Sequence, residues 1–177
     1  MKRSSLRAEV RFAGADGQGM PLIAQILAEA SFAGRFHVVE TSTHEMEVRG
    51  GLNISDVIIS DSEIEFPKPQ GLDILIALSQ EGYDAAAEEL KKESIQILDS
   101  LHVGKISKIS QLIIEPLTNI SHEKTGSEEY ANFVALGLAV KKLKIIKERH
   151  ILNVIKEKLQ VEDREKALKA FKEGLKL

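Results

Sequence analysis

The segment GADGQG, residues 14–19, has the composition of an anion-binding turn. A glycine loop between a strand and a helix presents backbone N–H groups at the positive end of the helix dipole. Gly14, Gly17 and Gly19 have the spacing G-x-x-G-x-G, however, whereas the dinucleotide fingerprint is G-x-G-x-x-G. Glu40 lies where a ribose-binding acid is expected, but the absence of a following Gly-Lys-Ser/Thr excludes a P-loop. The spacing therefore disfavours an independent NAD enzyme, and the alternative is a tight turn that passes close to a neighbouring surface.

A second candidate is the segment EVRGG, residues 47–51. Arg49 beside Gly50 and Gly51 can present a guanidinium fork next to exposed backbone, which suits a phosphate or a carboxylate. The alternative is a flexible turn with one solvated arginine, and composition alone favours that alternative.

A third candidate follows the apolar segment 73–79, which has almost no polar interruption and is typical of a strand covered on both faces. Ser79 and Gln80 come directly after it, at the end where open α/β sheets bind ligands. Ser79 can equally cap the next helix. The five histidines are scattered, without H-x-x-x-H or H-E-x-x-H spacing, and no nucleophile elbow occurs. We therefore expect no catalytic residue and no metal site in this chain.

The overall composition narrows the class of protein further. The chain has 177 residues, 43% hydrophobic and 29% charged, and a net charge of −3, which argues against a nucleic-acid partner. It has no cysteine, which excludes disulfides, a thiol nucleophile and an iron–sulfur cluster ligated within this chain. No apolar run is long enough for a bilayer, and the first residues lack the apolar centre of a signal peptide. We expect a cytoplasmic protein with no membrane partner.

The elements that would position these residues follow from periodicity. Glu9 and Arg11 alternate with Val10 and Phe12, which indicates a strand. Strands are expected at 8–14, 35–42, 73–79, 94–100 and 110–117, with a loop at 42–51 and a hairpin of 52–60 with 63–67. Helices are expected from Pro21 to Gly34 and at 80–92, 128–143, 149–158 and 162–172. This order predicts a three-layer α/β/α sandwich with a mixed, mostly parallel sheet, Rossmann-like, in a single domain over 1–177 whose C-terminal helical part covers about 128–177.

Together these segments resemble the gamma subunit of 2-oxoacid:ferredoxin oxidoreductases over nearly the whole chain. The residues that carry the resemblance are GADGQGMPLIAQILAEA, EVRGG, SDVIISDSEIEFP, DILIALSQEGYD, ILDS, NFVALG and KALKAFKEG, in the family's order. Asp16 stands where the family loop usually has glycine, and its carboxylate would repel a phosphate. HEMEVRGG leans toward the indolepyruvate type, whereas ALSQEGYD and SDVIISDSEI lean toward the 2-oxoglutarate or general 2-oxoacid type.

The resemblance implies a subunit that is not catalytic alone. The whole complex would decarboxylate a 2-oxoacid, here 2-oxoglutarate, oxidatively to its acyl-CoA and pass electrons to ferredoxin. Thiamine diphosphate and the iron–sulfur clusters would belong to the alpha and beta subunits, with a ferredoxin-like delta subunit as a further candidate partner. Coenzyme A or substrate would lie close to this chain, and the isolated chain would form a homodimer. Alternatives are an indolepyruvate- or pyruvate-type subunit, an independent Rossmann-like enzyme, or an orphan ligand-binding module. The residues expected near a ligand or partner are Gly14, Gly17, Gln18, Gly19, Arg49, Gly50, Gly51, Ser79 and Gln80.

Overall fold

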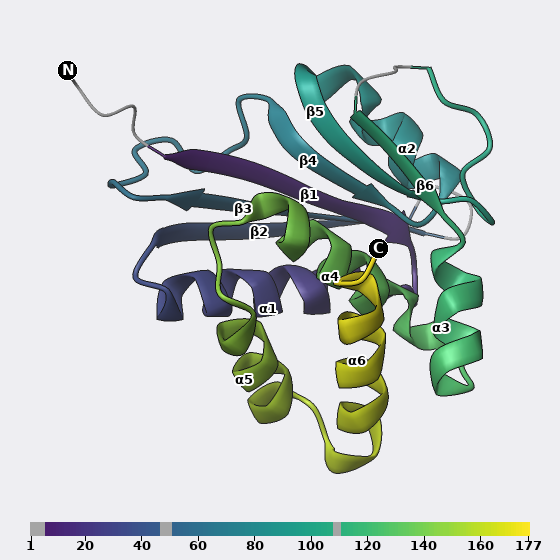
Figure 1. Ribbon diagram of the computed structural model, residues 1–177. Coiled ribbons are helices and arrows are strands. Elements are labelled where there is room, and N and C mark those ends of the chain that lie inside the picture. The colour runs from purple at the N-terminus through teal and green to yellow at the C-terminus, as the bar shows by residue number, and fades with distance from the viewer. Residues whose placement is uncertain (1–5, 47–50, 108–110) are drawn as a thin grey trace.

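The computed structural model describes residues 6–46, 51–107 and 111–177, and its strands form one sheet in the order β2-β3-β1-β4-β5-β6 (Figure 1). Within the described residues, β3 alone runs antiparallel to its neighbours, β1 and β2, while β1, β4, β5 and β6 are parallel. The predicted mixed, mostly parallel sheet is confirmed. The strands are β1 (Arg7–Ala15), β2 (His37–Glu45), β3 (Leu52–Ser60), β4 (Leu72–Ala77), β5 (Leu90–Asp99) and β6 (Gln111–Glu115).

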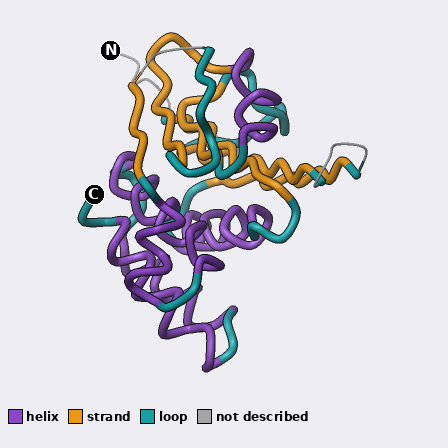
Figure 2. Tube along the Cα trace, turned by 90° about the vertical axis from the view of Figure 1, so that its right-hand side faces the viewer, coloured by secondary structure: helices purple, strands orange, loops and turns teal. Residues whose placement is uncertain are grey.

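The helices cover the two faces of the sheet unequally. Figure 2 shows most of them gathered on one side of the sheet, whereas Tyr83 and Ala86 of α2 pack in a smaller core on the other side. The predicted α/β/α sandwich is therefore confirmed, with one thick and one thin helical layer. The helices are α1 (Met20–Ala33), α2 (Gln80–Ala86), α3 (Leu117–Thr125), α4 (Ala131–Leu143), α5 (Glu148–Lys158) and α6 (Val161–Gly174), with short 3-10 helices η1 (Ala87–Glu89) and η2 (Glu128–Tyr130).

Strand β1 has two chemically different faces. Val10 and Phe12 are fully buried in the larger core, on the side of α1. On the opposite face Arg11, only 6% exposed, donates from Nε and Nη2 to both carboxylate oxygens of Asp56, at 2.7 and 3.0 Å, and from Nη1 to Glu89. Burial alone would lower the pKa of the Arg11 guanidinium, but the hydrogen bonds to the two carboxylates outweigh it and raise that pKa. The alternation therefore reflects two buried faces rather than one buried and one solvated.

The predicted hairpin of 52–60 with 63–67 is wrong. Both edges of β3 are already paired, with β1 on one side and β2 on the other, so residues 63–67 have no free edge to join and form no strand. The hairpin is instead β2–β3, in a register that runs from His37 opposite Ser60 to Glu45 opposite Leu52. Strand β2 thus continues to Glu45, into the first part of the expected loop at 42–51.

The helices differ from the sequence prediction in two further places. The helix predicted over 80–92 stops at Ala86 and, after η1, gives way to β5, because Leu90 already pairs with Leu72 of β4. The strand expected in 110–117 and ended by Pro116 is β6, which stops at Glu115, and Pro116 precedes the first turn of α3. Helix α3 was not predicted, since LTNISHEKT offers few apolar residues at helical spacing.

The C-terminal helices dock through very close contact of backbones. A Cβ atom added to Gly137 of α4 would overlap the carbonyl oxygen of Phe171, and one added to Gly174 of α6 would overlap that of Val134. The hydroxyl of Tyr130 also donates to Asp163 Oδ1 at 2.7 Å. Burial, together with this hydrogen bond, raises the pKa of Tyr130 to about 12.

We expect Gly137→Ala to lower the free energy of unfolding by about 2 kcal/mol, because two helix backbones must separate to admit the methyl group. Urea unfolding followed by circular dichroism measures this difference. Gly104→Ala is the matched control, since a Cβ at Gly104 has no atom within 4 Å among the described residues. Equal stability of Gly137→Ala and the unaltered chain would contradict the close approach.

Candidate functional site

The candidate site lies where the connections after β1 and β4 leave the sheet on opposite faces. These strands are parallel neighbours, yet α1 packs on one face and α2 on the other (Figure 1). Doubly wound sheets bind their ligands at the carboxyl ends of strands at such a point. A cavity of about 310 Å³ is found there. Its lining residues are Asp16, Gly17, Gln18, Leu78, His102, Thr118, Glu128, Glu129, Ala131 and Asn132.

Gln18 joins the ends of the two strands. The backbone N–H of Ala15 donates to Gln18 Oε1 at 2.7 Å, and Gln18 Nε2 donates to the carbonyl oxygen of Leu78 at 2.8 Å. The side chain therefore connects the end of β1 to the residue that follows β4, and it lines the cavity as it does so. A contact of this amide with a ligand or partner stays a prediction.

The glycines before α1 have separate structural reasons. Gly17 and Gly19 have φ of 81° and 69°, the left-handed region in which other residues are strained. A Cβ at Gly19 would collide with the amide of Asn132, whose Nδ2 donates to the Gly19 carbonyl oxygen at 3.4 Å. A Cβ at Gly14 would lie 2.6 Å from Gln18 Oε1. A tight turn therefore accounts for Gly17 by its φ alone, for Gly14 by its close contact with the Gln18 side chain, and for Gly19 by both its φ and its contact with Asn132.

Asp16 ties the same loop to the β2–β3 hairpin. Its Oδ1 accepts a hydrogen bond from Asn53 Nδ2 at 3.1 Å, and Asn53 Oδ1 lies 3.0 Å from His44 Nδ1. Gly51 packs against this carboxylate, because a Cβ there would lie 3.0 Å from Asp16 Cβ. Gly51 is thus beside the glycine loop, whereas Arg49 and Gly50 lie outside the described residues.

The charges around the cavity are mainly negative. Asp16, Glu128 and Glu129 contribute carboxylates, and His102 is the one basic side chain among the described residues that line it. His102 Nε2 lies 4.0 Å from the buried carboxylate of Asp99, which also accepts a hydrogen bond from Thr118. Among the described lining residues three carboxylates face one basic side chain, so this part of the lining disfavours the phosphates of a nucleotide, of thiamine diphosphate or of coenzyme A.

Ser79 and Gln80 hold local structure rather than line this cavity. Ser79 Oγ accepts a hydrogen bond from the N–H of Gly82 at 3.0 Å and caps α2, the simpler of its two predicted roles. Gln80 Oε1 accepts from the N–H groups of Gly104 and Lys105, at 3.0 and 2.9 Å, and fixes the loop after β5. Any contact of either side chain with a ligand or partner stays a prediction.

Sequence reasoning missed the far wall of the cavity. Glu128, Glu129 and Asn132 come from η2 and the start of α4, more than 100 residues after the glycine loop, and Thr118 comes from the unpredicted α3. The one available signal was Asn132, a polar residue in the first turn of a helix expected to be apolar on most sides.

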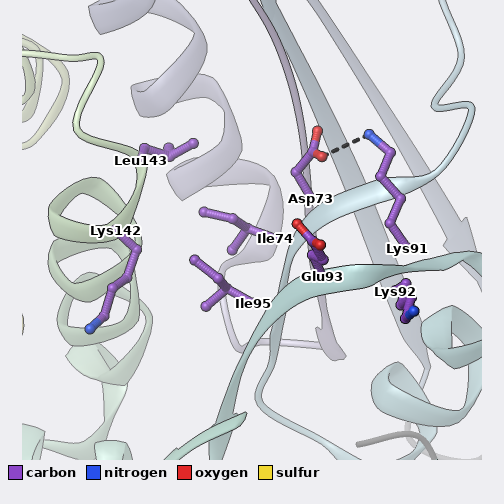
Figure 3. Close-up of a pocket in the computed structure, with 8 residues that line it drawn as sticks. All are labelled: Asp73, Ile74, Lys91, Lys92, Glu93, Ile95, Lys142 and Leu143. Atoms are coloured by element: carbon purple, nitrogen blue, oxygen red, sulfur yellow. Dashed lines mark hydrogen bonds and ion pairs between the residues drawn. The ribbon is translucent and has the colours of Figure 1, made fainter. Parts of the chain in front are cut away.

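A larger hollow of about 530 Å³ lies at the opposite end of the sheet, near the amino ends of β4 and β5. Figure 3 shows its ion pair, Lys91 Nζ to Asp73 Oδ1 at 2.7 Å, and shows Ile74, Ile95 and Leu143 pointing toward one another while Lys142 points away. It is distant from the carboxyl ends of the strands and is the weaker candidate.

In the part of the chain that the structure describes, no group of three His, Asp or Glu side chains is arranged to hold a metal ion, and no helix could cross a bilayer.

This geometry defines a doubly wound α/β protein with an acidic cavity at the carboxyl ends of its strands. The chain belongs to the pyruvate ferredoxin/flavodoxin oxidoreductase family, whose sequence model matches residues 9–177, so the predicted family resemblance is confirmed. It is 31% identical to the 2-oxoglutarate synthase subunit KorC of Methanocaldococcus jannaschii, over 98% of this chain and 95% of that one.

Two solved structures share the fold. The gamma subunit of a keto/oxoacid ferredoxin oxidoreductase from Geobacter sulfurreducens matches with a TM-score of 0.84 and 31% identity, over 96% of both chains. The 2-oxoglutarate:ferredoxin oxidoreductase of Magnetococcus marinus, with 2-oxoglutarate, coenzyme A and succinyl-CoA bound, matches with a TM-score of 0.82 over 96% of this chain and 30% of that one. At 22% identity the second match bears on the fold alone.

We expect Gln18→Ala to lower the free energy of unfolding by about 1–3 kcal/mol, because it leaves the Ala15 N–H and the Leu78 carbonyl oxygen without their partner. Chemical denaturation measures the difference. Gln70→Ala is the control, since the Gln70 side chain is exposed. Stability unchanged by Gln18→Ala would show that this amide does not join the two strands.

Proposed function

We propose that this chain is the gamma subunit of a 2-oxoglutarate:ferredoxin oxidoreductase. Such a complex oxidatively decarboxylates 2-oxoglutarate to its acyl-CoA and transfers the electrons to ferredoxin. The observation that carries the proposal is the match to a 2-oxoglutarate synthase subunit along almost the whole length of both chains. The relatives among ketoisovalerate and indolepyruvate oxidoreductases match less of this chain, at 73% and 75%, and at lower identity.

The division of work between subunits follows from what this chain contains. It has no cysteine to ligate an iron–sulfur cluster, and its acidic cavity does not fit a diphosphate. Thiamine diphosphate, which supplies the decarboxylation chemistry, and the clusters therefore belong to the alpha, beta and ferredoxin-like delta subunits. This chain binds those subunits and shapes the approach of coenzyme A or substrate. Separated from them, it forms a homodimer that covers exposed apolar surface.

The proposal predicts the composition and activity of the native complex. Anaerobic affinity purification of the tagged chain from its host, followed by mass spectrometry, should recover the thiamine diphosphate-binding and cluster-binding subunits. The recovered complex should reduce ferredoxin with 2-oxoglutarate and coenzyme A, and much more slowly with pyruvate or indolepyruvate. A homo-oligomer without such subunits would favour an orphan binding module, and a preference for another 2-oxoacid would overturn the substrate.

We also propose that Arg49 contacts an anionic group at the subunit interface, either a coenzyme A phosphate or a carboxylate. Arg49 precedes Gly51 by two positions, and Gly51 lies against Asp16 at the edge of the cavity. A planar guanidinium suits bidentate contact with phosphate, while the carboxylates of the cavity itself repel it.

We expect Arg49→Ala to raise the KM of the complex for coenzyme A by more than about tenfold, with 2-oxoglutarate affinity unchanged, if the anion is a phosphate. Steady-state kinetics with varied coenzyme A measures this. Arg149→Ala, which removes an exposed arginine from α5, is the control. If the Arg49→Ala complex has an unaltered KM for both substrates, the proposed contact of Arg49 with an anionic group is wrong.

A further inference from the structure

An apolar groove runs between α1, α5 and β2, at the opposite end of α1 from the cavity. It has a volume of about 470 Å³. Ala28, Val38 and Val154 line it, one from each of the three elements, and Val154 is buried. Figure 1 shows α1 lying between β2 and α5, so these elements meet along one side of the molecule. The groove is thus built on regular structure rather than on loops.

Phe32 stands at this groove and is 75% exposed. It lies in the last turn of α1, and among the described residues its ring does not belong to the hydrophobic core. An exposed aromatic ring beside an apolar groove is a feature of protein interfaces, where such rings contribute a large share of the binding energy.

The groove has a negative rim. Glu29, Glu40 and Glu157 are the charged residues that line it. Lys158 Nζ neutralises Glu29 at 2.6 Å, whereas Glu40 accepts a hydrogen bond from the neutral hydroxyl of Ser42. For Glu157 the described residues record no ion pair or hydrogen bond. Among the described residues, no cation pairs with the carboxylates of Glu40 and Glu157 that flank the apolar floor.

We infer that this groove is a docking surface for a basic segment of a partner subunit, one that presents an apolar side chain between lysines or arginines. The apolar side chain would cover Phe32 and fill the space above Val38 and Val154, and the cations would neutralise Glu40 and Glu157. The inference rests on the proposed function, in which this chain works inside a multi-subunit oxidoreductase. It goes beyond it by naming the face of the chain that is covered and the chemistry of what covers it.

The test is a comparison of two matched triple variants in the native host. The groove variant is Phe32→Ser with Glu40→Lys and Glu157→Lys. The control variant, Phe66→Ser with Glu63→Lys and Glu65→Lys, makes the same changes on the loop after β3, where Phe66 is 50% exposed. Each tagged chain is purified anaerobically, and quantitative mass spectrometry gives the ratio of partner subunits to tagged chain.

We expect the ratio of captured partner subunits to tagged chain to fall at least about tenfold in the groove variant. The control variant should capture as much as the unaltered chain. Equal thermal unfolding of the isolated chains excludes a folding defect. A milder double variant, Glu40→Gln with Glu157→Gln, should make the capture of partner subunits less sensitive to salt, because it removes the charge attraction. This second variant keeps the test decisive if the triple variant unfolds.

Each other outcome overturns the inference. Normal capture by the groove variant overturns the docking surface but leaves the subunit assignment standing. Equal loss in both triple variants shows that the groove has no special role. Loss of self-association instead of partner capture assigns the groove to a second copy of this chain. If the unaltered chain captures no partner subunit, the proposed function fails first and the docking surface fails with it.

Discussion

The guanidinium of Arg11, buried on the thin side of the sheet, constrains the rest of the fold. A buried cation must be neutralised, and here Asp56 of β3 and Glu89 of η1 do so. The first contact fixes how β3 lies against β1, and the second fixes where the chain turns after α2 to enter β5. On the other face of β1, Val10 and Phe12 belong to the larger core, to which α1, α3, α4, α5 and α6 contribute. The side chains of β1 therefore help to position the structure on both faces of the sheet.

The cavity follows from this arrangement. Because α1 and α2 leave β1 and β4 on opposite faces, a gap opens at their carboxyl ends, and the Gln18 amide spans it at its base. In doubly wound folds this is the position for a ligand, yet Asp16, Glu128 and Glu129 make it unsuitable for a diphosphate. The chain thus has the scaffold of a nucleotide-binding fold, with carboxylates at the position where such folds bind phosphates. That combination is consistent with a subunit whose work is to contact other subunits.

Much of the fold was accessible from local pattern. The alternation around Val10, the apolar run at 73–79 and the strongly apolar helix at 128–143 each predicted an element that the structure contains. The errors arose where a distant partner overrides local pattern. Residues 63–67 resemble a strand in composition, but the edge of β3 that they would need is taken by β2. The segment after Ala86 has helical composition, but pairing with β4 draws it into β5.

The sequence by itself determined the family, the glycine turn and the near wall of the cavity, because Gly17 and Gln18 are adjacent in the chain and their chemistry is local. Only the tertiary structure decided the far wall, since Glu128 and Asn132 reach the glycine loop from more than 100 residues away through the packing of α4 on the core. It also decided that the cavity is acidic, because charge at a site is the sum over side chains that the fold brings together. Spacing along a chain carries no such information.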